Sequence, residues 1–188
     1  MRESKRTQIL DDAARVVQRE GIASVTYETV AAEAGLTKGG LVYHFPSRES
    51  LILAAHQRLA EEWEASMAAA ITTNVDQATE NEKLRGYARA ATQSATRAEL
   101  LMMLEGATTA DHAAPWNAVL ERWTPAPPTV DADEETLARF ITRLAADGLW
   151  VYESLADRPL DLEVRRRLAD LLAAGLTDTE ITTGACDD

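Results

Sequence analysis

A pair of short helical segments joined at a glycine constrains this chain more than any other feature of its sequence. The segment Thr26–Leu51 reads TYETVAAEAGLTKGGLVYHFPSRESL. Its small Ala31 allows a second helix to approach the first closely, and Gly35 supplies the positive φ that a tight turn needs. Thr26 and Thr37 are suited to cap the two helices with their hydroxyl groups. The pattern predicts a helix-turn-helix.

The rest of the chain carries apolar residues at helical spacing, and no stretch alternates as a strand would. We therefore predict an all-α fold of about nine helices. The expected ranges are 4–20, 27–34, 37–44, 48–72, 80–95, 97–110, 111–123, 133–156 and 161–175, with a proline-rich linker at 125–129.

Two local features sharpen this prediction. The run Leu100–Leu104 is apolar on every side, so its helix is expected to be central and buried. Asp111 is the expected cap of the following helix, with Pro115 in the first turn, where a missing N–H costs little.

The composition favours a cytoplasmic protein with a sizeable core. Of the 188 residues, 46% are apolar, yet no apolar run is long enough to span a membrane, and no signal peptide is evident. Cys186 is the single cysteine, so no internal disulfide can form, as is typical of a reducing compartment. No membrane partner is expected.

The net charge of −12 is unevenly distributed along the chain. Residues 1–48 carry seven Lys and Arg against six Asp and Glu, whereas residues 49–188 carry twelve against twenty-five. An acidic protein is a poor partner for a polyanion, but here the acidity lies beyond the predicted helix-turn-helix. The asymmetry is compatible with one DNA-facing end.

The helix-turn-helix segment resembles the TetR family of bacterial repressors. The matching positions are Thr26, Val30, Ala31, Ala34, Gly35, Leu36, Thr37, Gly39, Leu41, His44, Phe45, Arg48 and Leu51. Three phrases, at residues 44–48, 97–101 and 144–149, are also similar to the multidrug-responsive, CgmR-like members. The resemblance implies a DNA-binding domain over 1–47 and a ligand-binding and dimerisation domain over 48–176. Residues 177–188 are polar, lack any period, and are predicted to be a disordered tail.

The resemblance also implies a set of DNA contacts. The recognition helix would enter the major groove, with Lys38 as the candidate for a guanine contact. Gly39 and Gly40 lower helix propensity, so the free recognition helix is expected to be loose. The full set of expected contacts is Thr26, Tyr27, Thr37, Lys38, Gly39, Tyr43, His44 and Arg48.

The second domain is rich in tryptophan, methionine and interleaved carboxylates. Aromatic faces and carboxylates together attract a flat lipophilic cation, and methionine adapts to different shapes. The family resemblance places a ligand pocket among these helices. The expected lining is Trp63, Met102, Glu105, Trp116, Asn117, Trp123 and Asp147, although each tryptophan could instead be ordinary core.

The last two predicted helices resemble the family's dimer interface. Ala145 and Gly148 would allow close helix approach, and Leu168, Leu171 and Leu172 would supply apolar area. A homodimer would place two recognition helices in successive major grooves of a double-stranded, near-palindromic operator. A small-molecule inducer would release it.

Other classes of function remain open at this stage. No nucleophile–base pair, phosphate loop or metal-ligand spacing is recognisable, so neither catalysis, a cofactor nor a metal is expected. A DNA-silent ligand-binding dimer is one alternative, and the intact Lys38, Tyr43 and Arg48 argue against it. A regulator of the same type that senses a neutral lipid, acyl thioester or lactone is separated from the cation hypothesis only by Glu105, Asp111 and Asp147.

Overall fold

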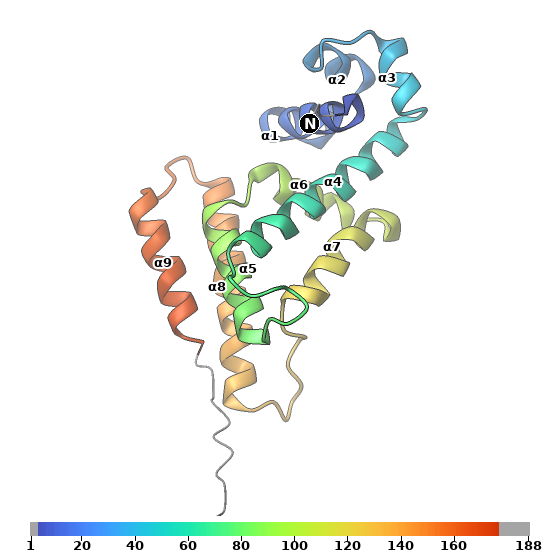
Figure 1. The fold of residues 1–188 in the computed structure, drawn as a ribbon. Helices are drawn as coiled ribbons and strands as arrows, with labels where there is room; N and C mark the ends of the chain where they lie inside the picture. The colour runs from blue at the N-terminus through green and yellow to red at the C-terminus, as the bar shows by residue number, and fades with distance from the viewer. Residues whose placement is uncertain (1–3, 177–188) are drawn as a thin grey trace, which may run out of the picture.

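The computed structural model describes residues 4–176, and every regular element in this range is helical. The predicted all-α class is confirmed, and no helix in the range has the length and apolarity needed to cross a membrane. Nine α-helices and one 3₁₀ turn follow each other in this part of the chain (Figure 1): α1 (Lys5–Glu20), η1 (Ile22–Ser24), α2 (Tyr27–Glu33), α3 (Lys38–His44), α4 (Arg48–Ala69), α5 (Glu80–Gln93), α6 (Arg97–Gly106), α7 (Ala110–Trp123), α8 (Glu134–Leu155) and α9 (Leu162–Ala174). The predicted tail at 177–188 lies outside the described residues.

Helices α1, α2 and α3 form a small group at one end of the molecule (Figure 1). Val30 of α2 and Leu41 of α3 are fully buried in the same core cluster as Ile9 of α1. The turn between α2 and α3 contains Gly35 at φ 63°, the left-handed conformation that favours glycine. Local sequence signals thus fix this group: the Thr37 hydroxyl accepts the Gly40 N–H at 3.1 Å and caps α3 as predicted.

Helix α4 connects this group to the rest of the chain (Figure 1). Ser47 caps it by accepting the Ser50 N–H at 3.0 Å. The stripe that begins at Leu51 and runs through Leu59 to Trp63 and Met67 is buried along its length. One rigid element therefore joins the helix-turn-helix to the second core.

Helix α5 is the centre of the second group. It packs against α4, α7, α8 and α9. Helices α8 and α9 also contact each other, and α9 lies at the edge of the molecule away from α7 (Figure 1). The outer side of this pair is apolar.

The structure corrects two local predictions. Helix α7 begins at Ala110 with Thr109 in the cap position, so Asp111 lies in the first turn and Pro115 lies inside the helix. Thr109 holds the cap position without a side-chain capping hydrogen bond, and it lies two residues before the predicted cap with no local capping signal. Helix α6 is not buried all round, because the Leu104 side chain is 63% exposed.

The Gly86→Ala substitution is expected to destabilise the protein by about 1–3 kcal/mol through overpacking. A Cβ on this residue of α5 would lie 2.8 Å from Ile71 Cγ2, 3.0 Å from the Met67 carbonyl oxygen and 3.1 Å from the Trp123 ring. Urea unfolding of the two proteins at one chain concentration measures the difference.

The matched control is Gly39→Ala in α3. A Cβ there meets only Thr37 Oγ1, at 4.0 Å. Alanine should therefore stabilise α3 by up to about 1 kcal/mol, because it has the higher helix propensity. Equal effects at the two glycines would show that close helix packing is not the reason for Gly86.

Candidate functional site

The side chains on the outward side of α3 are exposed and make few contacts with the rest of the protein. Tyr43 is 85% exposed, and Val42 is 40% exposed. Thr37, Lys38 and Gly39 at the start of the helix are exposed as well. The fully buried Leu41 anchors the inward side of α3 in the core. The residues on the outward side do not pack against the core, so they are accessible to a partner.

Lys38 has a partner on α2 that the sequence pattern does not reveal. Its Nζ lies 2.6 Å from Glu28 Oε1, and both side chains are largely exposed. The pairing lowers the pKa of Glu28 and raises that of Lys38. Because an exposed pair of this kind is weak, the ammonium group remains available to another anion.

Two further residues of the expected DNA set make bonds that shape the helix-turn-helix. Tyr27 donates its hydroxyl to the Phe45 carbonyl at 2.7 Å, which ties the start of α2 to the end of α3. Arg48, the first residue of α4, donates its Nε–H to the Val25 carbonyl at 2.7 Å. Both side chains therefore hold backbone geometry in the DNA-free protein.

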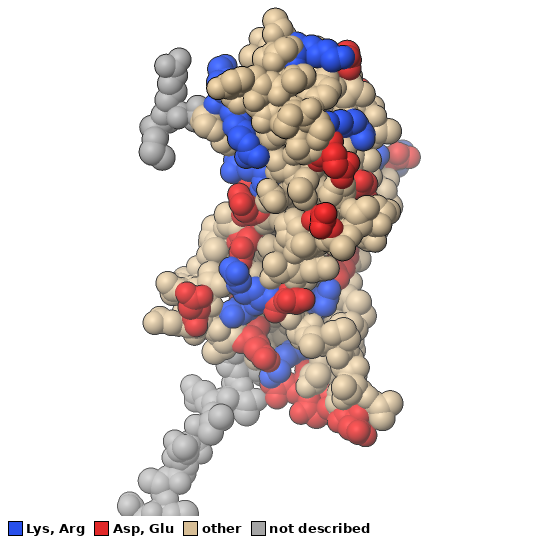
Figure 2. Space-filling view, turned by 90° about the vertical axis from the view of Figure 1, so that its right-hand side faces the viewer, with Lys and Arg blue, Asp and Glu red and all other residues tan. Residues whose placement is uncertain are grey.

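The charge on the surface follows the division seen in the sequence. Figure 2 shows several Lys and Arg side chains at the end of the molecule that holds α1–α3, while the opposite end of the same face carries mainly Asp and Glu. A polyanion such as DNA would therefore meet the least unfavourable electrostatic potential at the end of the molecule that holds α1–α3.

The centre of the second group is an aromatic cluster around Trp63 of α4. The ring centroid of Trp63 lies 5.5 Å from Tyr87 of α5, 6.0 Å from Trp116 of α7 and 5.4 Å from Trp150 of α8. All four side chains are almost fully buried. The cluster therefore joins α4 to three other helices through one set of ring contacts.

The four indole N–H groups of the chain differ in their partners. Trp116 donates to His56 Nδ1 at 2.9 Å, Trp123 to Glu64 Oε1 at 3.0 Å and Trp150 to the Thr96 carbonyl at 3.0 Å. Among the described residues, none accepts a hydrogen bond from Trp63 Nε1, although this atom is buried. An unsatisfied buried donor is uncommon and destabilising.

The expected ligand-binding residues differ in burial and in their partners within the chain. Trp63, Trp116 and Met102 are buried in the core, and Trp123 is buried on α7. Asp147 of α8 accepts a hydrogen bond from the Tyr87 hydroxyl, and burial raises the pKa of both groups. Asn117, by contrast, is exposed on α7.

Glu105 lies in a polar cluster that the sequence pattern does not reveal. Its Oε2 is 2.8 Å from His56 Nε2 and 3.0 Å from His112 Nδ1. The three residues come from α4, α6 and α7, and 49 positions separate His56 from Glu105. No spacing rule connects such distant positions, so only the tertiary structure shows the cluster.

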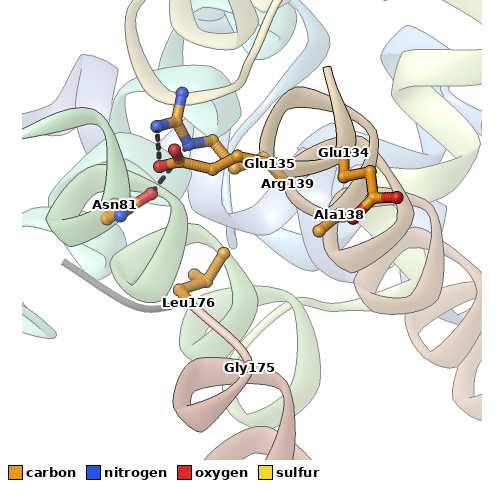
Figure 3. Close-up of a pocket in the computed structure, with 7 residues that line it drawn as sticks. All are labelled: Asn81, Glu134, Glu135, Ala138, Arg139, Gly175 and Leu176. Carbon is orange, nitrogen blue, oxygen red and sulfur yellow. Dashed lines mark hydrogen bonds and ion pairs between the residues drawn. The ribbon is translucent and has the colours of Figure 1, made fainter. Parts of the chain in front are cut away.

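Two open cavities mark the edges of the second group. One, of about 390 Å³, lies beside α5 and α8 near the end of α9 (Figure 3). Arg139 crosses it and donates to Asn81 Oδ1 at 3.0 Å and to Glu80 Oε2 at 3.0 Å, so its guanidinium is already committed. The other, of about 320 Å³, is lined by Trp123, Leu84 and the residues that follow α7.

The outer side of α8 and α9 forms an apolar groove of about 330 Å³. Its lining consists of Ala145, Gly148, Leu149, Tyr152, Leu168, Leu171 and Leu172. Leu171 is 68% exposed, and a Cβ at Gly148 would meet open space. A contiguous apolar surface of this kind is typical of an interface.

Two family models match the chain, and together they span more than half of it. The model described as bacterial regulatory proteins, tetR family, matches residues 9–55. The model described as tetracyclin repressor-like, C-terminal domain, matches residues 81–177.

Individual relatives agree with these matches. The HTH-type transcriptional regulator YerO of Bacillus subtilis (strain 168) is 35% identical over 51 residues, which are 27% of this chain and 18% of YerO. The chain thus matches less than a fifth of that relative's length. A structure of the multidrug binding protein EbrR complexed with malachite green is 26% identical, with a TM-score of 0.57 over 90% of this chain and 98% of that one. A transcriptional regulator from Saccharomonospora viridis in complex with choline is 22% identical over 89% of this chain and 94% of that one, with a TM-score of 0.65, and shares the fold.

Proposed function

Because the chain belongs to the TetR family of bacterial regulatory proteins, we propose that this transcriptional regulator is a dimeric repressor of the multidrug-responsive, CgmR-like type, released from its operator by a small lipophilic compound. The exposed side of α3 carries the proposal. A helix with Lys38 and Tyr43 outward and Leu41 fully buried matches the way a recognition helix docks in a major groove.

The proposal assigns a role to each part of the chain. Residues 1–47 would bind DNA, and residues 48–176 would bind the ligand and form the dimer. The proposed DNA contacts are Thr26, Tyr27, Thr37, Lys38, Gly39, Tyr43, His44 and Arg48. The hydrogen bonds of Tyr27 and Arg48 in the free protein suggest that both also position the helices while they reach phosphates.

The operator would be a near-palindrome read by two protomers. A two-fold dimer through α8 and α9 needs recognition helices roughly 34–36 Å apart to meet successive major grooves. The apolar groove lined by Leu171 and Gly148 supports this choice of interface.

The ligand would be a flat aromatic cation held in the second domain. Two observations support this class: the aromatic cluster around Trp63, and the 26% identity to EbrR, whose structure holds malachite green, a cationic dye. The proposed lining is Trp63, Met102, Glu105, Trp116, Asn117, Trp123 and Asp147. Because most of these side chains are buried, binding requires the core to open.

A neutral ligand is the second candidate, and a specific observation favours it. Glu105 already faces two histidines, and Asp147 already accepts the Tyr87 hydroxyl and lies 3.7 Å from Arg143 Nε. A carboxylate with such partners offers less attraction to an added cation. The two candidates differ in which probe releases the operator.

Helix α4 is the proposed lever between the two sites. It runs from Arg48, beside the helix-turn-helix, to Trp63 and Met67 in the aromatic cluster. A ligand that binds a splayed dimer better than the DNA-competent one would shift the equilibrium toward release. A nearly complete shift requires several kcal/mol of differential affinity.

Fluorescence anisotropy with labelled DNA from upstream of the gene tests the proposal, at one stated salt concentration. We expect specific binding, and we expect ethidium to release it. Release only by a neutral apolar compound would support the repressor function but would show that the ligand is neutral and not cationic. No specific binding to any DNA from this region would contradict the proposed function.

The Lys38→Ala substitution is expected to weaken operator binding roughly 10- to 100-fold, as the loss of one direct base contact does. The melting temperature should not change, because Lys38 and its partner Glu28 are both largely exposed. Anisotropy and thermal unfolding measure the two quantities on the same samples.

Glu28→Gln is the matched control. It removes the partner and keeps Lys38, so operator binding should be at least as tight as in the unchanged protein. If both substitutions weakened binding equally, the ion pair itself, and not the lysine, would be what DNA binding needs.

A further inference from the structure

The strongest unassigned feature is the cluster of His56, Glu105 and His112, in which both histidines are buried and Glu105 is partly exposed. One ligand atom from each residue lies within 4.8 Å of the others. His56 Nε2 and His112 Nδ1 approach Glu105 Oε2 at 2.8 Å and 3.0 Å. His56 is fully buried, and His112 is 4% exposed. The imidazole rings are stacked, with centroids 4.5 Å apart. Three helices thus bring two nitrogens and one carboxylate oxygen to a single point.

The packing around the cluster brings these groups close together. Gly106 ends α6 directly after Glu105, and a Cβ there would lie 3.1 Å from the His112 carbonyl oxygen and 3.4 Å from His56 Cε1. A larger residue would therefore crowd His112 and His56, which would have to give by a few tenths of an ångström. The glycine leaves room for α6 to pack closely against both histidines.

The surroundings of His112 match those of a metal-bound histidine. Its second nitrogen, Nε2, lies 2.8 Å from Glu49 Oε1 in the first turn of α4. A ligating histidine commonly donates its other N–H to a carboxylate, which fixes the ring and raises its basicity. Glu49 stands in the place of such an outer carboxylate.

The surroundings of His56 show what a metal would have to displace. Trp116 Nε1 is a donor only, and it points at His56 Nδ1 at 2.9 Å. The hydrogen-bond network therefore assigns the His56 proton to Nε2, facing Glu105. A metal at Nε2 takes the place of that proton, Nδ1 becomes protonated, and the indole N–H loses its acceptor.

We propose that His56, Glu105 and His112 form a binding site for a divalent transition metal of the Zn²⁺ class, in competition with the Trp116–His56 hydrogen bond. Two imidazole nitrogens and one carboxylate oxygen are ligands that Zn²⁺ accepts, with a water in the fourth position. Because Trp116 contacts Trp63, metal binding would also alter the aromatic cluster.

The test is calorimetric titration of the metal-stripped full-length protein with Zn²⁺, without DNA. We expect one ion per chain and a quenched or shifted tryptophan emission. His56→Gln and His112→Gln should each weaken binding by roughly 100-fold or more, and Glu49→Gln by about 10- to 100-fold, as for an outer-shell residue. Glu49 is largely exposed, so its variant is expected to fold normally.

Two controls cover the remaining histidine and the thiol, which are the other nitrogen and sulfur side chains that zinc prefers. His44→Gln removes the third histidine, which lies on α3 outside the cluster, and Cys186→Ser removes the single thiol. Neither should change the Zn²⁺ affinity. Loss of binding in Cys186→Ser, or unchanged binding in a His56→Gln, His112→Gln double variant, would overturn the site.

Trp116→Phe gives the sharpest prediction, because it removes the competing donor and keeps a large aromatic ring. Zn²⁺ affinity should rise by about tenfold, the equivalent of one hydrogen bond. A purely structural cluster would show no gain. An affinity that is unchanged or lower would overturn the proposed competition. All of these measurements are made without operator DNA, so they stand apart from the proposed function.

Discussion

The Leu171→Glu substitution is expected to separate the proposed dimer into monomers and to lower operator affinity by roughly 10²- to 10⁴-fold. Leu171 lines the apolar groove between α8 and α9 and is 68% exposed in the single chain. The isolated protomer should therefore tolerate a charge there. In a two-fold dimer the same substitution buries two carboxylates at one interface, which is strongly unfavourable.

The control for this prediction is Leu104→Glu. Leu104 is 63% exposed on α6, which is not part of the α8–α9 groove, so its variant should remain a dimer and keep its operator affinity. Light scattering after size exclusion gives the mass, and anisotropy gives the affinity. If the Leu171→Glu protein remained a dimer, the dimer interface would have to lie elsewhere on the molecule.

The helix boundaries near the N-terminus could be predicted because their causes are local. Thr26 and Thr37 each bond an N–H three residues ahead, and Gly35 adopts the positive φ that the turn requires. These interactions depend on residues within one turn, so a sequence pattern contains them completely. The start of α7 was mispredicted because no side-chain cap marks it: Thr109 holds the cap position without a capping hydrogen bond, and Asp111 lies in the first turn.

The candidate sites could be predicted only in part, because their geometry is tertiary. The exposure of Tyr43 follows from its place opposite the buried Leu41 on a short helix. The partners Glu28 for Lys38, Tyr87 for Asp147 and His112 for Glu105 depend on how separate helices dock. No periodicity within one helix carries that information.

The hydrogen bonds that Glu105 and Asp147 make within the chain also affect which class of ligand can bind. From the sequence, both carboxylates suggest attraction for a cation, because nothing in the pattern shows what else they meet. In the structure each is already hydrogen-bonded within the chain. Attraction of a cation would therefore require the ligand to displace a protein donor, which makes the aromatic faces the larger source of affinity in the proposed pocket.

The Trp63→Ala substitution is expected to destabilise the protein by about 3–5 kcal/mol, because it opens a cavity in the core. Trp63 is fully buried and contacts aromatic residues on three other helices. Trp63→Phe should cost about 1 kcal/mol or less. It loses part of the ring contacts, but it also removes a buried N–H that has no acceptor among residues 4–176, and such a group carries a penalty of about 1–3 kcal/mol.

Urea unfolding at a fixed chain concentration measures both variants, since the stability of a dimer depends on concentration. If Trp63→Phe were as damaging as Trp63→Ala, a bound water or ligand would have to satisfy the indole N–H in the native protein. The release of operator DNA by ethidium then distinguishes a role of Trp63 in core packing from a role in ligand binding. Under conditions where Trp63→Ala remains folded, retained operator binding without release by ethidium would place the ligand against Trp63. Loss of both activities together would mean that the indole serves only to hold α4 in the core.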